Sequence, residues 1–312
     1  MSRLVASLFA AGVALAACRA TPPSSSDAPA AQPASAETPG VGTSGVGAAA
    51  ELVRSDDPVT RRRHAELMRW AASEGLAARP LGEVAVALGQ RLVGVRYVAG
   101  VLDAPAEETL LAPLDRFDCV LYVESVLALA RGVVAGDTTF GGYLGRVEQQ
   151  RYRGGRMDGY GSRLHYFSEW IDDNGARSLV RDVTANAQRH EPYTRRLGFM
   201  TAHVDRYPHL ADAAALADVR AAEARANAVR RTYVPKAVAR GAYAAIEPGD
   251  VLATTTSVDG LDVSHVGFAV RTAQGIGFLH ASPQGGVKLS PDLHAYLAGN
   301  RAQTGVFIVR PL

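Results

Sequence analysis

Cysteine and lysine are both scarce in this chain of 312 residues. The only cysteines are Cys18 and Cys119, and the only lysines are Lys236 and Lys288. The formal net charge is only +2. This total implies neither nucleic-acid binding nor strong attraction to an acidic surface. Arginine carries nearly all the positive charge. This bias suits the gripping of carboxylates, although a GC-rich genome produces the same bias, and we prefer that explanation.

The chain also lacks a long hydrophobic run. The most apolar stretch, Leu4 to Leu15, is shorter than the roughly 20 residues that a bilayer-spanning helix needs. Arg3 precedes it and small residues ending on Cys18 follow, which is the pattern of a lipoprotein signal peptide. We therefore expect residues 1–18 to be a signal peptide and Cys18 to carry a lipid, so that the protein is exported and anchored to a bacterial membrane. Since Arg19 is no retention signal for the inner membrane, we expect the outer membrane, facing the periplasm.

Large apolar residues are almost missing from residues 19–50, which consist mainly of Ala, Pro, Ser, Thr and Gly. Such a segment cannot bury enough surface to offset chain entropy, so it is predicted to be a disordered tether. Residues 51–312 are long enough for one large domain or a domain with an insertion. The sequence contains no internal repeat.

The first half of this domain has helical periodicity. Helices are predicted over Thr60–Glu74, Pro80–Leu92 and Cys119–Ala130, with Asp118 as N-cap of the third helix and Gly132 as its stop. The segment between Leu92 and Gly100 is bracketed by glycines, so we expect a short extended stretch or loop at the edge of a site. Residues 137–247 are mixed, and their clearest helix is the Ala-rich stretch Ala211–Arg231.

The last third changes to the period of β-strands. Strands are predicted over four stretches rich in Val, Ile, Phe and Thr: Asp250–Thr256, Ser264–Arg271, Ile276–Ser282 and Gly305–Arg310. Thr272 to Gly275 forms a hairpin loop, and Ser290-Pro291 begins a short helix. Helices followed by an antiparallel sheet predict an α+β fold.

Cys119 is the first candidate for chemistry. If Cys18 is lipidated, Cys119 has no partner for a disulfide within the chain, so it is either an inert buried residue or a reactive thiol. Its predicted place in the first turn of a helix favours the reactive thiol, because free N–H groups and the helix dipole favour an anion there. We expect this position to lower the pKa of the thiol.

A thiol nucleophile needs a base, and histidine is the usual one. Of the eight histidines, His265 and His280 fall in the predicted hairpin. If its loop has four residues, Thr272 to Gly275, two residues face each other across the hairpin when their numbers sum to 547. The two imidazoles then lie on one face of the sheet, where the second ring can orient the first. Two independently bonded histidines in a sheet remain the alternative. His165 is set apart from the other histidines by its place in an arginine and aromatic cluster over 151–170.

Five short motifs follow one another in an order that resembles a known superfamily. They are G-x-x-Y-x-x-G at 94–100, D-C at 118–119, P-G-D at 248–250, H-V-G at 265–267 and H-A-S at 280–282. Together they look like the NlpC-type, papain-like bacterial cell-wall cysteine hydrolases. The chain is most similar to the N-acetylmuramoyl-L-alanine amidase-like branch, whose members share FDC-x-x-Y-V-E (117–124), YR-x-G (152–155) and R-x-HY (163–166).

The resemblance spans residues 92–312 and implies both a fold and an activity. The fold would be papain-like, with an inserted, mainly helical lobe at about 137–247 between the Cys helix and the His strands. The activity would be cleavage between N-acetylmuramic acid and L-alanine in peptidoglycan or muropeptides, without a cofactor or a metal. Two departures are the bulky residues 120–122 after the D-C pair and the long separation of cysteine from histidine.

The resemblance also implies site residues. Cys119 would be the nucleophile, His265 the base, His280 the third polar residue and Tyr97 a site-border residue whose hydroxyl could meet the oxyanion. The candidates for substrate binding are Asp118, Arg153, Tyr160, Arg163, His165 and Ser264. For the arginines, salt bridges within the insertion remain an equal alternative.

Three other functions stay open at this stage. A γ-D-glutamyl-diamino acid endopeptidase would use the same catalytic residues. A zinc amidase is disfavoured because the chain has no H-E-x-x-H and the paired histidines lack an obvious third ligand. A noncatalytic lipoprotein that binds wall peptides would keep the fold without turnover. Protein partners and the oligomeric state are unknown.

Overall fold

The computed structural model describes residues 57–312. The predicted signal peptide, the lipidation at Cys18, the tether over 19–50 and the first six residues of the predicted domain lie outside the described residues. Within residues 57–312 no helix combines the length and apolar character that a membrane span requires.

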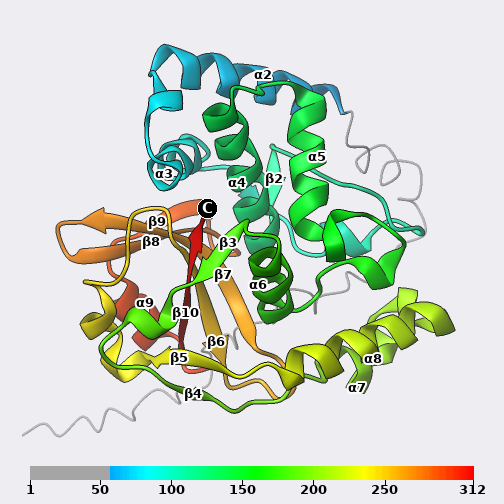
Figure 1. Ribbon diagram of the computed structural model, residues 1–312. Helices are drawn as coiled ribbons and strands as arrows, with labels where there is room; N and C mark the ends of the chain where they lie inside the picture. The colour runs from blue at the N-terminus through cyan, green and yellow to red at the C-terminus, as the bar shows by residue number, and fades with distance from the viewer. Residues whose placement is uncertain (1–56) are drawn as a thin grey trace, which may run out of the picture. The chain divides into compact units, whose positions relative to one another are not determined.

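The described residues form a mixed α+β fold with a large antiparallel sheet (Figure 1). The α-helices are α2 (Pro58–Ser73), α3 (Leu81–Arg91), α4 (Cys119–Ala135), α5 (Phe140–Arg151), α6 (Phe167–Ala176), α7 (Phe199–Ala202), α8 (Ala213–Ala228) and α9 (Leu293–Gly299). The strands are β1 (Arg96–Tyr97), β2 (Arg116–Phe117), β3 (Val180–Asp182), β4 (Glu191–Tyr193), β5 (Arg231–Pro235), β6 (Val251–Thr256), β7 (Val263–Thr272), β8 (Gly275–Ser282), β9 (Gly286–Ser290) and β10 (Gln303–Pro311).

The sheet has the strand order β4-β5-β10-β6-β7-β8-β9, and β3 also pairs with β10. Phe268 pairs with Leu279 and Thr272 with Gly275, which is the predicted hairpin register. The strands β3, β4, β5 and β9 were not predicted. The first three come from residues 137–247, so this mainly helical segment is not a separate lobe but supplies strands to the sheet.

Helix α4 begins where the sequence predicted and ends later. The Asp118 carboxylate accepts a hydrogen bond from the Leu121 N–H at 2.7 Å, which fixes the N-terminus at Cys119. Gly132 does not stop the helix: it lies inside α4, where a Cβ would come 2.3 Å from Arg146 of α5. The helix ends at Ala135 because Gly136 adopts φ 71°, the left-handed conformation that glycine tolerates.

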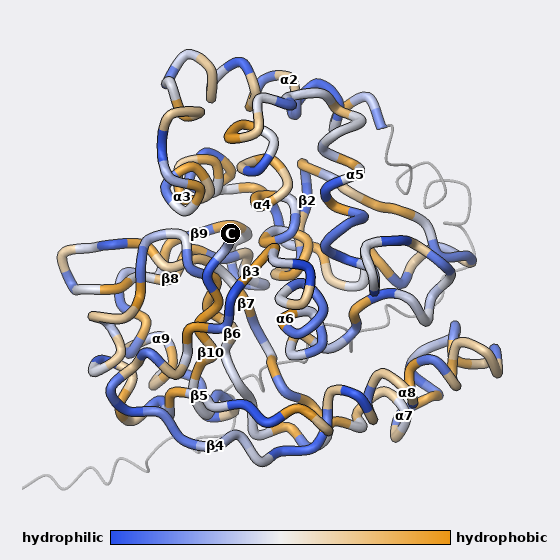
Figure 2. The backbone as a smooth tube through the Cα atoms, in the orientation of Figure 1, coloured by the Kyte–Doolittle hydropathy of each residue, from blue (hydrophilic) through white to orange (hydrophobic). Residues whose placement is uncertain are grey.

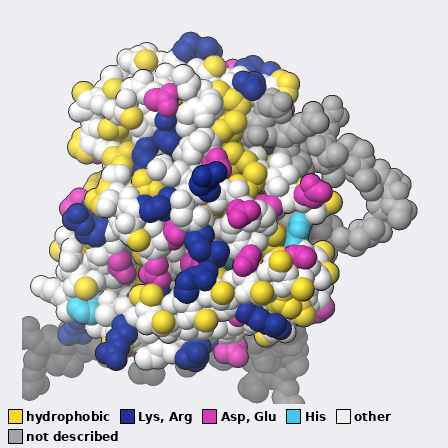
Figure 3. All heavy atoms as spheres, turned by 45° about the vertical axis from the view of Figure 1, so that its right-hand side comes forward, with side chains coloured by type: hydrophobic (Ala, Val, Ile, Leu, Met, Phe, Trp, Pro, Cys, Tyr) yellow, Lys and Arg dark blue, Asp and Glu magenta, His cyan; other side chains and the backbone are white. Residues whose placement is uncertain are grey.

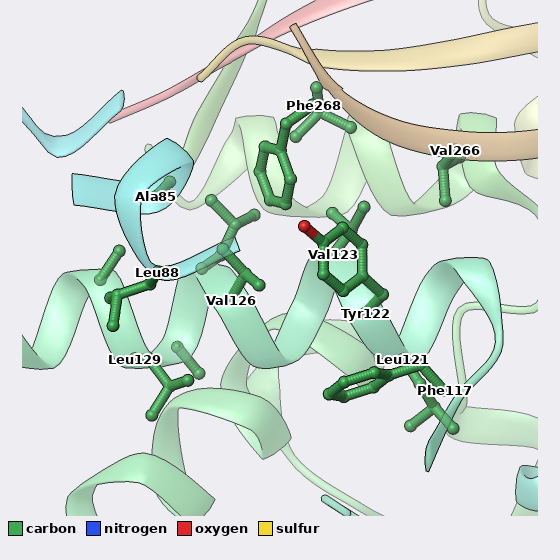
Figure 4. Close-up of a cluster of buried hydrophobic side chains, with 14 of the residues drawn as sticks. Ala85, Leu88, Phe117, Leu121, Tyr122, Val123, Val126, Leu129, Val266 and Phe268 are labelled. Atoms are coloured by element: carbon green, nitrogen blue, oxygen red, sulfur yellow. The ribbon is translucent and has the colours of Figure 1, made fainter. Parts of the chain in front are cut away.

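Both faces of the sheet are covered. One face packs against α4 and its neighbouring helices, and the other packs against α9 and the 3₁₀ turn at Lys236–Ala242. Figure 4 shows the first layer, in which Tyr122 and Val126 of α4 point toward Phe268 of β7. Because both sheet faces are covered, β6 is buried along its whole length and β7 along all but its last two residues. Figure 2 shows hydrophobic stretches in these strands interrupted by polar positions, among them the threonines that end β6 and the Ser264-His265 pair of β7.

The surface carries charges of both signs. On the face seen in Figure 3, Lys and Arg side chains alternate with Asp and Glu side chains. This mixed pattern agrees with the small formal net charge of +2. It gives no field of one sign over that face that would attract a nucleic acid.

Candidate active site

Cys119 lines a small cavity at the N-terminus of α4. The cavity has a volume of about 110 Å³, and its wall includes Ser264, His265 and Val266 from the beginning of β7. Packing of α4 on β7 thus brings together residues that are about half the chain apart in sequence. Cys119 is only 1% exposed, so the cavity is the route by which another molecule can reach the sulfur.

Burial controls the ionisation of Cys119. Burial, with a smaller contribution from the negative charge of Asp118, raises the pKa of the thiol to about 12. Hydrogen bonds from the backbone N–H groups of Val266, Cys119 and Val120 lower the pKa but do not outweigh burial. The expectation of a lowered thiol pKa was therefore wrong for the resting site, because desolvation exceeds the effect of the helix N-terminus.

His265 and His280 are in direct contact. The distance from His265 Nε2 to His280 Nδ1 is 2.6 Å, and both rings are buried. Burial lowers the pKa of His265 to about 4 and that of His280 to about 2, and the charge of Lys288 adds to both effects. Both imidazoles are therefore neutral near pH 7, so one ring nitrogen of each is a donor and the other an acceptor.

Ser290 extends this contact to a third residue. Its hydroxyl lies 3.1 Å from His280 Nε2. If His280 donates from Nε2 to Ser290, its Nδ1 accepts from His265 Nε2, which leaves His265 Nδ1 as a bare acceptor. Ser290 belongs to β9, a strand that the sequence did not predict, and its only available signal was its place beside a proline.

Two aromatic rings hold the histidine pair in place. Phe278 stacks on His280 at a centroid distance of 4.7 Å and meets His265 edge-on at 5.7 Å. Tyr296 of α9 contacts His280 at 5.0 Å, edge to face. These contacts restrict ring rotation and keep water away, which is the physical cause of the low imidazole pKa values.

A buried ion pair lies at the back of the cavity. The Arg151 guanidinium donates to Glu124 at 2.6 Å, and the Trp170 indole N–H donates to the same carboxylate at 3.2 Å. Glu124 and Arg151 both line the cavity and are almost fully buried. They fix α4 to α5 and α6, and their roles were not predicted from the sequence.

Residues 87–305 match a family described as N-acetylmuramoyl-L-alanine amidase-like. This match covers well over half of the chain and includes Cys119 and both site histidines. The chain belongs to this amidase-like family. No curated protein matches it.

Solved structures agree with the family. An N-acetylmuramoyl-L-alanine amidase from Bacteroides uniformis is 31% identical, with a TM-score of 0.68, and the alignment covers 74% of this chain and 99% of that one. A candidate xylanase from Bacteroides fragilis is 32% identical, with a TM-score of 0.62 and coverage of 71% and 98%. A protein from Legionella pneumophila is 19% identical, with a TM-score of 0.60 and coverage of 81% and 96%, which indicates a shared fold.

Four of the predicted binding residues line the cavity of this amidase-like chain: Asp118, Arg163, His165 and Ser264. The Ser264 hydroxyl is buried and makes no hydrogen bond within residues 57–312. His165 Nε2 lies 2.9 Å from the Tyr160 carbonyl, to which it must donate. Burial lowers the pKa of His165 to about 3, so the ring is neutral and suits a hydroxyl or an amide rather than a carboxylate.

The Arg163 guanidinium is bound by other groups of the same chain. It pairs with Asp103, donates to the Leu102 carbonyl at 2.7 Å and lies over the Tyr160 ring. It therefore holds the loop over 101–103 at the cavity, and Leu102 and Asp103 also line the wall. Asp118 is held by its N-cap hydrogen bond, and burial raises its pKa to about 6.

Three further candidates are not part of the cavity wall. Arg153 forms an ion pair with Glu169 at 2.8 Å, which is the salt bridge in the insertion that the sequence left open. Tyr160 lies behind His165, stacked on His209 at 4.4 Å. Tyr97 pairs with Phe117 between β1 and β2 and packs against the core, so it borders the Cys119 segment through the backbone.

Metal ligands do not gather in the described residues. Among residues 57–312, no three His, Cys, Asp or Glu side chains are grouped so that they could hold one ion. The histidine pair belongs instead to a hydrogen-bonded series with Ser290.

Proposed function

We propose that this chain is a cysteine amidase of the bacterial cell wall that hydrolyses the bond between N-acetylmuramic acid and L-alanine. The observation that carries the proposal is that Cys119 and His265 line one cavity, with the imidazole held at 2.6 Å by His280. Membership of the amidase-like family and the 31% identity to a solved amidase support the choice of bond. The papain-like, NlpC-type fold is part of this proposal.

The reaction begins with a neutral thiol and a neutral imidazole. His265 Nδ1 takes the thiol proton as Sγ of Cys119 attacks the lactyl carbonyl carbon. The N–H groups of Cys119 and Val120, which face the sulfur in the resting site, stabilise the oxyanion once the sulfur has bonded to carbon, because neither is used in the helix ladder and Asp118 caps only Leu121. We assign these two N–H groups in place of the Tyr97 hydroxyl.

The C–N bond then breaks. His265 gives its proton to the leaving amine of L-alanine, and the muramic acid remains on Cys119 as a thioester. Water attacks the thioester carbonyl while His265 again takes a proton. The released carboxylic acid and the restored thiol complete the cycle. His280 and Ser290 keep Nδ1 of His265 unprotonated between steps.

The bond that is cut is tested by the products. A defined muropeptide incubated with the protein should give a free glycan acid and a peptide that begins with L-alanine, as measured by mass spectrometry. An endopeptidase would instead leave L-alanine attached to the sugar. That second product pattern would contradict the amidase assignment while keeping the cysteine mechanism.

A glycosidase is disfavoured by the state of the carboxyl groups. The xylanase name of one relative would require two carboxyl groups placed on either side of a sugar bond. Of those that line the cavity, Asp118 caps α4, Glu124 pairs with Arg151 and Asp262 accepts from the Ser168 N–H at 2.7 Å. Asp103 is paired with Arg163.

Zinc catalysis and simple binding have their own tests. Inhibition by a chelator but not by iodoacetamide would indicate a metal enzyme and overturn the proposal. Binding of wall peptides without any turnover, at neutral pH with a reducing agent, would indicate the noncatalytic lipoprotein.

The predicted signal peptide, residues 1–18, supports a proposal for where the protein resides. We propose that Cys18 is lipidated and that the protein is anchored to a bacterial membrane, facing the periplasm. Mass spectrometry of the mature N-terminus should find a diacylglyceryl group on Cys18. Partition of a Cys18→Ala variant into the detergent phase at the wild-type level would contradict the anchor.

A further inference from the structure

A second, larger cavity has its own set of lining residues. Its volume is about 900 Å³, and its wall is formed by β4, the residues that follow it, the end of α8 and the beginning of β5. These elements lie along the lower edge of the sheet in Figure 1. None of the residues that line this cavity also lines the cavity of Cys119.

Four arginines line this second cavity: Arg195, Arg196, Arg230 and Arg231. One carboxylate, Asp182, lies among them, so the lining carries an excess of positive charge. Arg231 is paired with Asp172 at 2.5 Å, and Arg195 donates to the Ser257 carbonyl at 2.8 Å. The Nε of Arg195 is buried and makes no hydrogen bond within residues 57–312.

Arg196 and Arg230 differ from the other two. Both are exposed, and within residues 57–312 neither forms a hydrogen bond or an ion pair. Two forked donors on one wall suit a ligand with two acidic groups.

The rest of the wall indicates what kind of anion fits. Val229 is 45% exposed, and Pro192 and Tyr193 add apolar surface beside the arginines. Thr194 adds a neutral hydrogen-bonding group, whereas the Asn227 amide is bonded to the Leu197 backbone. A cavity of about 900 Å³ is far larger than a phosphate ion needs, and apolar patches among arginines suit a short peptide with methyl groups and carboxylates.

We propose that this cavity, named here the arginine cavity, binds an acidic peptide segment with at least two carboxylates. In a wall amidase that peptide is a stem peptide of the wall, bound outside the cavity of Cys119. This choice of peptide rests on the proposed function, whereas the preference for a dicarboxylate does not. The site would hold the enzyme on polymeric wall while the Cys119 cavity acts on one muramoyl peptide.

The test uses the protein with Cys18→Ala and Cys119→Ala in every sample, so that binding is measured without the proposed lipid anchor and without turnover. Co-sedimentation with purified peptidoglycan should show about tenfold weaker binding for the double variant Arg196→Glu, Arg230→Glu, and binding should weaken as salt rises. The matched control is Arg189→Glu, Arg220→Glu, which makes the same charge change at two exposed arginines outside the cavity. Control binding should stay at the parent level.

Competition identifies the ligand. A free stem peptide with two carboxylates should displace the protein from peptidoglycan, whereas vesicles that contain a phosphate lipid should not. Equal loss of binding in both double variants, or displacement by the phosphate vesicles alone, would overturn the proposal.

The active enzyme separates this inference from the proposed function. With Cys119 present, Arg196→Glu, Arg230→Glu should keep the wild-type kcat/KM on a soluble muropeptide and lose rate on intact wall. If neither protein cleaves a muropeptide, the proposed function fails, yet a selective loss of binding would still support the arginine cavity.

Discussion

At the scale of single residues, burial decides the protonation state of the two reacting groups. The pKa of Cys119 is raised to about 12 and that of His265 is lowered to about 4, so the resting pair is neutral on both sides. In the proposed mechanism the thiol therefore loses its proton as it attacks, rather than waiting as a preformed thiolate. This state has a measurable consequence for the pH dependence of the reaction.

The first prediction concerns kcat/KM on a soluble muropeptide. The acid limb should lie well below the ordinary imidazole value of 6.5, because His265 stays neutral until its lowered pKa is approached. No basic limb from the thiol should be found up to about pH 9, because the thiol pKa is raised far above its ordinary value. A bell-shaped profile with limbs near the two unperturbed values would show that a thiolate–imidazolium pair is the resting state.

The second prediction concerns Ser290. Its hydroxyl accepts from His280 in the tautomer that leaves His265 Nδ1 free. Ser290→Ala should lower kcat by roughly tenfold with little change in KM, because the wrong tautomer becomes accessible. The matched control is Ser282→Ala, whose hydroxyl accepts from the Gln284 N–H and does not contact the pair. Equal kinetics for the two variants would show that Ser290 does not fix the tautomer of the histidine pair. Ser290→Thr keeps a hydroxyl and should keep the wild-type rate.

These residues also mark how far sequence reasoning reached. The predicted contact of His265 with His280 and the predicted meeting of Cys119 with His265 at one site agree with the structure, because one N-cap and one hairpin register fix these positions. Their catalytic roles stay predictions. Ser290 and Glu124 were missed because their contacts join elements whose packing no local pattern specifies. The thiol pKa was misjudged because the helix N-terminus is visible in sequence whereas desolvation is a property of the packed site.

At the scale of elements, α4 both packs in the hydrophobic core and positions the candidate nucleophile. Its first residue is Cys119, and its buried face packs on α3 and β7 (Figure 4). Tyr122 lies in this layer with its hydroxyl buried and without a hydrogen bond in the described part of the chain. Burying an unpaired hydroxyl costs stability, so this position is not optimised.

The third prediction follows from that hydroxyl. Tyr122→Phe should leave the free energy of unfolding equal or increase it, because only an unpaired polar atom is removed. Tyr143→Phe is the matched control and should cost about 1 kcal/mol, because the Tyr143 hydroxyl donates to the Ala112 carbonyl at 3.1 Å. Urea unfolding monitored by fluorescence measures both. A clear loss of stability for Tyr122→Phe would mean that its hydroxyl has a partner, such as a buried water.

The elements themselves were predictable to different degrees. Some elements have a clear periodicity, and the sequence predicted the central part of each. They are the helices α2, α3 and α4 and the strands β6, β7, β8 and β10. The strands β3, β4 and β5 have three to five residues and form only because β10 and β5 are there to pair with. Gly132 was misread as a stop because the same residue type serves close helix packing.

At the scale of the whole molecule, buried histidines couple stability to pH. The pKa is lowered to about 4 for His64, about 3 for His165, about 4 for His265 and about 2 for His280, mainly by burial. Below pH 6.5 the unfolded chain then binds more protons than the folded one, so stability falls as pH falls from 6.5 toward 4. Asp118 acts in the opposite sense, since its pKa is raised to about 6.

The fourth prediction isolates His64, which is far from the site in sequence and packs against Phe140 and Tyr143. The melting temperature should fall less between pH 6.5 and pH 5 for His64→Phe than for wild type, because one group that must be protonated on unfolding is gone. Scanning calorimetry at the two pH values measures this difference. Identical falls would show that His64 does not contribute to acid sensitivity.

The central claim is that the Cys119 sulfur is the nucleophile, and the rate of muropeptide cleavage by Cys119→Ala tests it most directly. A variant with the wild-type melting temperature should lose at least about a thousandfold in kcat/KM, because the sulfur that forms the covalent bond is absent. Cleavage within a few-fold of the wild-type rate would contradict the account.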